Sequence, residues 1–267
     1  NFKNFINLQI LKLQYITNID TYIPYLINIR ELHLIYSSIE LSKCKHLTNL
    51  KVIVSSPLMT TLKGIQEFKL LTNLEIFNSK IDLIPNEIKY LTLLETLNLG
   101  GNYINSIPKE IKYLSKLRIL NLKYNNITYS SLNNIWDLTN LKELNLSYNK
   151  LTKISPLITN LTNLINLNLS NNKITTCPIE IDGLINLQKL NLSNNEIFCI
   201  PNISKLINLT HFLYKNDKYD NVDRNIMFEK EEIYYEDENI YDEEYNIEDE
   251  YNNEDEYNNE EYDNDQL

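Results

Sequence analysis

The segment LTNLKELNLSYNKLTKISPLITNLTNLINLNLSNNKI, residues 138–174, gives nearly the same sequence twice, at an interval of 23 residues. A period of this length constrains the fold strongly, because each unit then stacks on its neighbours. The template L-x-x-L-x-x-L-x-L-x-x-N-x-I recurs along the chain. Units start near residues 5, 26, 47, 68, 91, 114, 138, 161, 184 and 206, and the unit at Leu47 fits only with one residue deleted. The sequence therefore predicts about ten stacked coils.

Each unit predicts the same local structure. The Leu-x-Leu alternation, as at Leu144 and Leu146, is typical of a short strand with one buried face, and neighbouring coils must share the core that this face lines. The segment PKEIKYL after Ile107 favours one helical turn with Pro at its start. An asparagine follows each strand where the chain must turn. Its amide can bond backbone groups that would otherwise be buried unpaired, and asparagine tolerates left-handed dihedral angles. These asparagines are Asn102, Asn125, Asn149, Asn172 and Asn195.

On these motifs the chain resembles the leucine-rich repeat proteins over roughly residues 5–217. The segment IPNEIKYLTLLETLNLGGNYINSIPKEIKYL resembles the intracellular, Ras-scaffold type of repeat, and LTNLKELNLSYNKLTKISPL resembles internalin repeats. The resemblance implies an α/β solenoid, a horseshoe with a parallel β-sheet on its concave side and short helical turns on its convex side. It also implies recognition of a protein partner on the concave face.

Charge divides the chain into two parts. Residues 1–217 hold 22 Lys and Arg against 15 Asp and Glu, whereas residues 218–267 hold 3 against 21. We assign residues 1–217 to the solenoid. Residues 236–267 are expected to form a disordered acidic tail rich in Tyr, Asn and Glu, because like charges repel and few aliphatic residues offset the ordering entropy. Residues 218–235 have apolar residues at helical spacing and are either a cap for the last coil or the beginning of the tail.

No pattern in the sequence points to catalysis or to a cofactor. His33 and His211 fall on distant units, and Cys44 with His46 supplies too few ligands for a structural zinc ion. The four glycines form no phosphate-binding motif. The sequence therefore predicts a protein that is not an enzyme and has no cofactor or metal.

Location and assembly are predicted from weaker features. No charged-then-apolar leader is present, and no apolar run approaches the roughly 20 residues that a membrane span requires. Three scattered cysteines do not make the disulfide-bonded caps of extracellular relatives. We expect an intracellular, cytoplasmic protein that is monomeric and does not bind membranes.

Residues that flank the core leucines should lie on the concave face, because side chains alternate along a strand. The central column there is predicted to run from Lys12 and His33 to Leu213, with neighbouring columns that carry aromatic residues, Ser170 and Ser193. Aromatic rings beside amides are favoured in protein interfaces. The candidate partner-binding residues are Tyr36, Phe77, Asn98, Asn121, Tyr124, Asn145, Tyr148, Asn168 and Asn191. Alternatively, the asparagine column is only the consensus of the repeat.

Two functions are compatible with these features. The first is a protein-interaction scaffold that binds a protein partner on the concave face. The second is binding of an anionic ligand or nucleic acid by the basic body, modulated by the acidic tail. Lysines do gather on the convex arms, but Glu87 and Glu110 lie in the same segments. A nucleic-acid domain usually has a more one-sided basic patch, so the first function is favoured.

Overall fold

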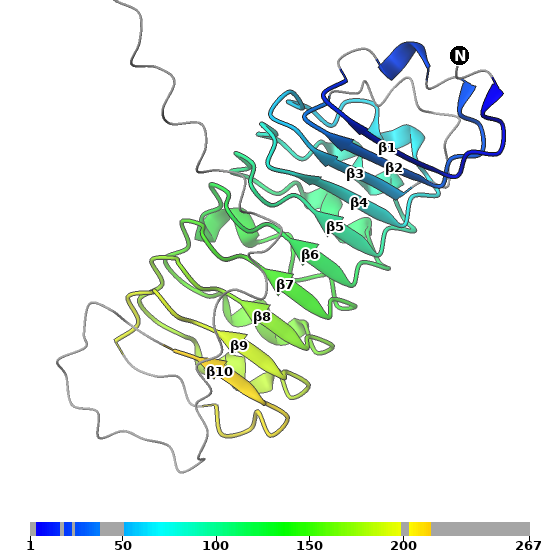
Figure 1. The fold of residues 1–267 in the computed structure, drawn as a ribbon. Helices are drawn as coiled ribbons and strands as arrows, with labels where there is room; N and C mark the ends of the chain where they lie inside the picture. Colours follow the sequence, from blue (N-terminus) through cyan, green and yellow to red (C-terminus); the bar gives the residue numbers. More distant parts are fainter. Residues whose placement is uncertain (1–3, 17–18, 23–24, 38–50, 199–202, 215–267) are drawn as a thin grey trace, which may run out of the picture. The chain divides into compact units, whose positions relative to one another are not determined.

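A computed structural model describes residues 4–16, 19–22, 25–37, 51–198 and 203–214. These residues contain ten parallel strands that form one sheet in chain order, β1 to β10 (Figure 1). The strands are β1 (Ile10–Gln14), β2 (Glu31–Ile35), β3 (Lys51–Ser55), β4 (Asn73–Phe77), β5 (Thr96–Asn98), β6 (Ile119–Asn121), β7 (Glu143–Asn145), β8 (Asn166–Asn168), β9 (Lys189–Asn191) and β10 (His211–Leu213). The prediction of a parallel solenoid sheet is confirmed.

The register of the sheet follows the repeat. Each strand pairs with the next so that residues at the same position of the repeat lie side by side. In β1 to β4 this position is the middle of the strand, and in β5 to β10 it is the last residue of the strand. The central column runs through Lys12, His33, Ile53, Glu75, Asn98, Asn121, Asn145, Asn168, Asn191 and Leu213. The central residues of β2 and β3 are His33 and its partner Ile53, respectively. The interval between them is one residue shorter than that between Lys12 and His33, as the deletion near Leu47 predicts. The predicted column is therefore correct at every strand.

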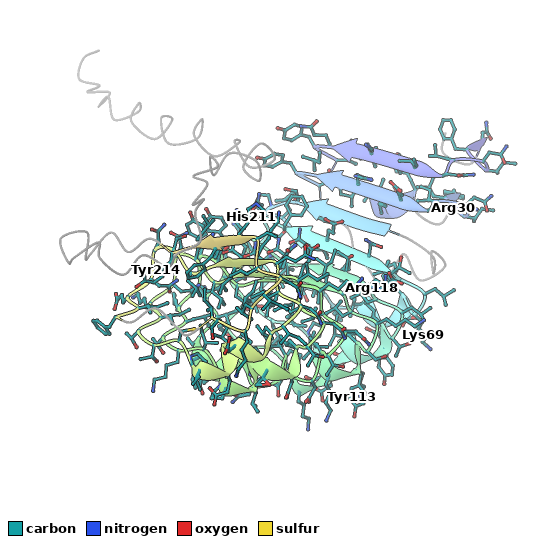
Figure 2. The ribbon with its side chains drawn as sticks, turned by 90° about the horizontal axis from the view of Figure 1, so that it is seen from below. Arg30, Lys69, Tyr113, Arg118, His211 and Tyr214 are labelled. Carbon is teal, nitrogen blue, oxygen red and sulfur yellow. The ribbon has the colours of Figure 1, made fainter. Side chains whose placement is uncertain are left out.

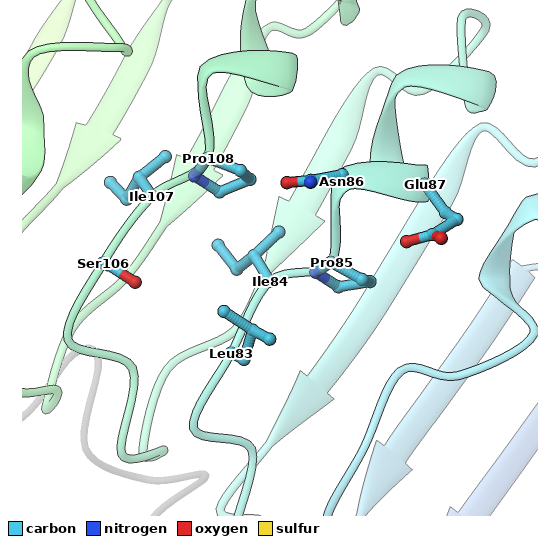
Figure 3. A pocket seen from close by; sticks show the side chains of 8 residues that line it. All are labelled: Leu83, Ile84, Pro85, Asn86, Glu87, Ser106, Ile107 and Pro108. Atoms are coloured by element: carbon cyan, nitrogen blue, oxygen red, sulfur yellow. The ribbon is translucent and has the colours of Figure 1, made fainter.

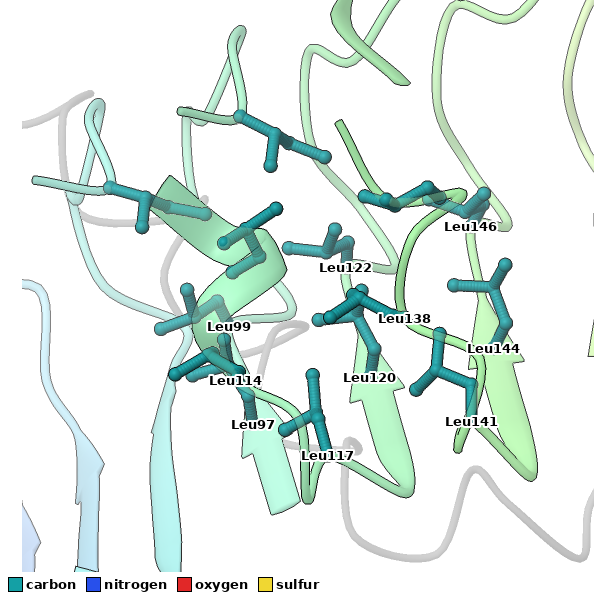
Figure 4. Packing of buried hydrophobic residues seen from close by; sticks show 14 of the residues in the cluster. Leu97, Leu99, Leu114, Leu117, Leu120, Leu122, Leu138, Leu141, Leu144 and Leu146 are labelled. Carbon is teal, nitrogen blue, oxygen red and sulfur yellow. The ribbon is translucent and has the colours of Figure 1, made fainter. Parts of the chain in front are cut away.

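The leucines on either side of this column form the core. Leu144 and Leu146 of one coil pack with Leu120 and Leu122 of the coil before it, and all four are at most 1% exposed (Figure 4). A strand of three residues buries too little apolar surface to be stable alone. Stacking lets each inner coil bury both of its sides against neighbours, and burial of a leucine side chain contributes about 1.5–3 kcal/mol.

The return arms carry short 3-10 helices on the side of the core opposite the sheet (Figure 2). Their bounds are η2 (Ile19–Thr21), η5 (Ile65–Glu67), η6 (Asn86–Tyr90), η7 (Lys109–Tyr113), η8 (Tyr129–Leu132), η9 (Pro156–Asn160) and η10 (Ile179–Gly183). Pro108 precedes η7 with extended dihedral angles, and Glu110 lies in the first turn. The predicted helical turn is therefore present, with the proline just before it.

The consensus asparagines connect each coil to the one before it. Asn149 is 8% exposed, and its Oδ1 accepts a hydrogen bond from the backbone N–H of Ile127 at 2.9 Å. Its Nδ2 donates to the carbonyls of Leu122 in the preceding coil and of Leu146 and Ser147 in its own. The same bonding pattern recurs at Asn102, Asn125, Asn172 and Asn195. We call these five residues the asparagine ladder.

Serine takes this position in two earlier coils. The buried Ser37 accepts a hydrogen bond from the N–H of Ile16 at 3.0 Å and donates to the carbonyl of Ile35. Ser79 likewise accepts from the N–H of Ser56 and donates to the carbonyl of Phe77. A hydroxyl has one proton to donate, so a serine makes fewer connections than an asparagine amide.

One part of the sequence interpretation is wrong. The residues with left-handed dihedral angles are not the ladder asparagines but the residues immediately before them. Their φ values lie between 52° and 64°, at Gly101, Tyr124, Tyr148, Asn171 and Asn194. In the earlier coils Tyr15, Tyr36 and Asn78, which precede Ile16, Ser37 and Ser79, have φ values between 46° and 57°. The ladder asparagine points inward to its four backbone partners, and the reversal of the chain falls on the preceding residue.

The predicted cap at 218–235 and acidic tail at 236–267 lie outside the described residues, as do Cys44, His46 and Cys199. The boundaries proposed for the cap and tail remain predictions. Within the described ranges, each helix is too short to cross a membrane.

Replacing a core leucine tests the shared core. Leu146 is 0% exposed, and Leu146→Ala is expected to lower the free energy of unfolding by about 2–5 kcal/mol through lost contacts and a residual cavity. Leu157→Ala is the matched control, because Leu157 is 52% exposed and should lose less than half as much. Urea denaturation of both variants measures the difference, and equal losses would contradict the assignment of the buried face.

A second substitution tests the asparagine ladder. Asn149→Ala removes the partner of one buried N–H and three carbonyls, and it is expected to cost at least about 2 kcal/mol of unfolding free energy. Asn163→Ala is the control, because exposed Asn163 makes one hydrogen bond to a carbonyl of the preceding coil. Thermal denaturation compares the two. A midpoint for Asn149→Ala as high as that of the control would show that water replaces the amide without cost.

Candidate functional site

The face of the sheet directed away from the core, which we call the open face, carries the predicted asparagine column. Asn98, Asn121, Asn145, Asn168 and Asn191 are half-buried and lie side by side in register. Each Oδ1 accepts a hydrogen bond of 3.0–3.1 Å from the backbone N–H two residues later. These amides therefore stabilise the end of each strand, which gives the column a structural role whether or not a partner also contacts it.

The serines predicted to lie on the surface beside this column are buried. Ser170 and Ser193 are 4% and 9% exposed, and each hydroxyl donates to the Oδ1 of the asparagine two residues earlier. Ser147 has the same arrangement with Asn145. Asparagine and serine thus form a closed pair within the coil, and the serine hydroxyls are directed to the protein rather than to a partner.

The left-handed residues form a further column at the end of the strands, and it contains the tyrosines. Asparagine and glycine adopt positive φ at little cost, whereas tyrosine does so rarely. The column holds Tyr15 and Tyr36 after β1 and β2, Asn78 and Gly101 after β4 and β5, Tyr124 and Tyr148 after β6 and β7, and Asn171 and Asn194 after β8 and β9. Some coils therefore have tyrosine at a position where other coils of the same solenoid have asparagine or glycine, which adopt a positive φ more easily.

Tyr124 and Tyr148 form one aromatic cluster with Lys123. The two ring centroids are 4.0 Å apart and the ring planes differ by 24°. The Nζ of Lys123 lies 4.9 Å from the centroid of Tyr124 and 5.9 Å from that of Tyr148, within the range of cation–π attraction. The tyrosines nevertheless remain 42% and 39% exposed. We call Lys123, Tyr124 and Tyr148 the tyrosine–lysine cluster.

The other two aromatic candidates do not join this cluster. Tyr36 stacks on Tyr15 with centroids 5.1 Å apart, at the beginning of the sheet. Phe77 ends β4, pairs with Ser55 of β3, and is half-buried. Strands are spaced by ~4.8 Å, so Tyr36 after β2 lies roughly 20 Å from Tyr124 after β6. The nine predicted residues therefore form an asparagine row, an aromatic cluster and two separate aromatic positions.

Lys123 was absent from the predicted site. The residue occupies the position where later coils have a buried serine, so the repeat template gave no reason to single it out. A signal was nevertheless present in the dipeptide Lys-Tyr, which also occurs at residues 89–90 and 112–113. There the lysine lies over the ring of its own neighbour, at 5.2 Å for Lys89 and 5.6 Å for Lys112.

The described residues offer little for other chemistry. No group of three or more His, Cys, Asp or Glu side chains among them could hold a metal ion. Burial raises the pKa of the Cys177 thiol to about 12, so this cysteine stays protonated and unreactive at neutral pH. On β2 the Nε2 of His33 lies 3.2 Å from the Oε2 of Glu31, so these two side chains form a pair on one strand.

A pocket of about 530 Å³ lies between two successive Ile-Pro steps of the return arms (Figure 3). It is lined by Leu83, Ile84, Pro85, Asn86, Glu87, Ser106, Ile107 and Pro108. Glu87 is the one titratable residue in this lining, so the pocket lacks the paired groups that acid–base chemistry requires.

Two comparisons place the chain among known proteins, and a third found nothing. The family described as "Leucine rich repeat" matches residues 92–151 and 139–197. A search of curated proteins found no match. The solved structures that resemble the chain include a leucine-rich repeat protein of Leptospira interrogans, which is 28% identical with a TM-score of 0.56. This chain is covered over 73% of its length, and it spans 62% of the Leptospira protein, less than two thirds.

Two further solved structures have the same fold. An internalin, InlF, from Listeria monocytogenes is 23% identical with a TM-score of 0.63, and the match covers 80% of this chain and 68% of the internalin. The leucine-rich repeat ectodomain of the plant membrane receptor kinase GASSHO1/SCHENGEN3 from Arabidopsis thaliana is 28% identical with a TM-score of 0.64. That match covers 79% of this chain and 27% of the plant chain.

The glycine pair after β5 tests the left-handed column. Gly101 has a φ of 64°, and a Cβ there would lie 2.2 Å from Oδ1 of Asn78 and 3.0 Å from its backbone nitrogen. Gly101→Ala is therefore expected to cost about 2 kcal/mol of unfolding free energy. At Gly100 the nearest atom to a new Cβ is 3.3 Å away, so Gly100→Ala should cost less than half of that. Chemical denaturation measures both, and the reverse order would contradict the backbone geometry.

Proposed function

Because the chain is a leucine-rich repeat protein, we propose that it is a non-enzymatic interaction scaffold that binds a protein partner on the open face of its sheet. The observation that carries this proposal is the tyrosine–lysine cluster at the ends of β6 and β7. Tyrosine is enriched at the energetic centres of interfaces, because its ring covers a large area and has few rotamers to lose. Two stacked rings are already ordered before a partner arrives, which lowers the entropic cost of binding.

The backbone at the cluster supports a selected role for the tyrosines. Tyr124 and Tyr148 have φ values of 52° and 53°, and the next two coils carry asparagine at the equivalent position. A non-glycine residue in this region costs of order 1 kcal/mol or more, and asparagine tolerates it best. Stability alone would therefore favour asparagine, and partner binding is a reason to retain the rings.

A relative gives this proposal independent support. The Arabidopsis ectodomain was determined in complex with CASPARIAN STRIP INTEGRITY FACTOR 2. By analogy, we propose that the repeats of this chain also serve recognition of another protein. Binding of nucleic acid by the body gains no support from the comparisons and is not proposed. An intracellular location, a monomeric state and the absence of membrane binding stay predictions of the sequence.

The proposal predicts that the rings carry affinity for the partner. Tyr124→Asn combined with Tyr148→Asn keeps the residue type that coils eight and nine use at positive φ, so the fold should persist. Proteins captured from a lysate by the full chain should lose about 2 kcal/mol or more of binding free energy to this variant. Biolayer interferometry with the captured protein measures the loss.

The matched control is Tyr90→Asn combined with Tyr113→Asn. These tyrosines are 46% and 53% exposed, and each lies beside a lysine at the end of a 3-10 helix, on the side of the core opposite the sheet. The control is expected to bind as the unmodified chain does. Equal losses for the two double variants, or a loss only for the control, would move the partner away from the open face.

A further inference from the structure

Charge at the carboxyl ends of β6, β7 and β8 is one-sided. The three segments that begin at the last residue of each strand read NLKYNNIT at 121–128, NLSYNKLTK at 145–153 and NLSNNKITT at 168–176. They contain Lys123, Lys150, Lys153 and Lys173 and no Asp or Glu. The opposite ends of these strands are mixed, because Arg118 lies 3.9 Å from Glu95, and Lys142 is followed by Glu143. The lysines at the edge that carries the tyrosines therefore have no carboxylate in their own segments, unlike the basic residues at the opposite edge.

Lys150 and Lys173 lie in neighbouring coils at equivalent positions. Each is exposed, and each backbone N–H donates to a carbonyl of the preceding coil, that of Ile127 for Lys150 and that of Leu151 for Lys173. Coils stack at ~4.8 Å, so two like charges project from adjacent levels. Neither lysine, nor Lys153, forms an ion pair with any carboxylate that the structure describes. An anion bound between the two lysines would relieve their mutual repulsion.

The tyrosine–lysine cluster adjoins this pair. Tyr148 precedes Lys150 by two residues, and the Lys123 ammonium lies over both rings. The arrangement combines a flat apolar surface of two stacked rings with cationic groups along one border. A complementary ligand has an apolar or aromatic side chain beside carboxylates, in an extended segment that reaches across three strands.

We propose that the segment of the partner that binds at Lys123, Tyr124, Tyr148, Lys150 and Lys173 is an acidic peptide carrying an aromatic residue. Its ring packs against Tyr124 and Tyr148, and its carboxylates lie over Lys150 and Lys173. This inference rests on the proposed function and adds the chemistry of the partner to it.

The width of the basic row argues for a peptide rather than for nucleic acid. In the coil that follows Lys173 the equivalent residue is Glu196, and in the coil that precedes Lys150 it is the neutral Asn126. The row is therefore bounded on one side by a negative charge and on the other by an amide. A phosphate backbone gains affinity by neutralising many charges in series, which a row of two lysines does not offer. A peptide of about six residues spans roughly 20 Å and suffices to cross the patch.

The test uses the full chain and a fluorescein-labelled peptide of about eight residues, rich in Glu and containing one Tyr. Fluorescence anisotropy gives the dissociation constant at low salt. Lys150→Gln combined with Lys173→Gln is expected to weaken binding about fivefold to tenfold, since two exposed charge pairs are lost. The Tyr124→Asn, Tyr148→Asn variant should weaken it at least as much. Raising the salt concentration should reduce the effect of the lysine substitutions, because exposed charges are screened.

The matched control is Lys89→Gln combined with Lys112→Gln, which removes the same charge from two lysines that also contact tyrosine rings. It should leave peptide affinity within about twofold. A peptide with Gln in place of each Glu should bind at least about tenfold more weakly than the acidic one. The proposal is overturned if the Gln peptide binds equally well, if the control variant weakens binding as much as the test variant, or if single-stranded DNA of equal charge binds more tightly than the peptide.

The two proposals fail in different ways. If the protein captured from a lysate loses affinity for the tyrosine variant but not for Lys150→Gln, Lys173→Gln, the open face binds a partner and the acidic character of that partner is wrong. If neither variant affects the captured protein, the proposed function itself is wrong at this site.

Discussion

The buried amide of the ladder asparagine is the interaction on which the stacking of coils depends. A solenoid must reverse its chain at the end of every strand, and each reversal would bury backbone groups without partners. At Asn149 one side chain satisfies an N–H and three carbonyls, and two of those four groups belong to the preceding coil. The leucines supply the larger favourable free energy, but their packing is less directional than a hydrogen bond. The amide fixes one register, because its partners have fixed positions and directions.

This constraint also determines what the open face can present. The residue before the ladder position takes the left-handed conformation whether that position holds asparagine, serine or, at Ile16, an aliphatic residue, and its side chain then lies at the edge of the sheet. Where that residue is Asn78 or Gly101, the edge carries a small polar side chain or none. Where it is Tyr124 or Tyr148, the same backbone projects two rings close enough to stack. The candidate site therefore occupies a position that recurs in other repeats with the same backbone geometry. Tyr124 and Tyr148 differ from their asparagine equivalents in other coils only in the side chain.

The asparagine column illustrates how a structural role can resemble a functional one. Its side chains lie on the open face in register, as expected, yet each Oδ1 is used to hold the N–H two residues later. The serines beside it are occupied in the same way at Ser147, Ser170 and Ser193. Both sets have local bonds within one coil, which explains why the consensus repeats them. The tyrosines differ, because the local backbone does not require a ring.

The sequence by itself determined the parallel sheet, the order of its strands and the central column, including the shortened interval at Ile53. It could do so because leucine spacing encodes which residues of each coil face the core, and a fixed period makes that information repeat. The tertiary structure alone decided which residue takes the positive φ, which backbone groups of the preceding coil each ladder amide bonds, and that Lys123 lies over two rings from different coils. Those outcomes depend on contacts between residues 20 or more positions apart, such as Asn149 with Leu122 and Tyr124 with Tyr148. The residue pattern of one repeat does not predict such contacts, because they form only when one coil stacks on another.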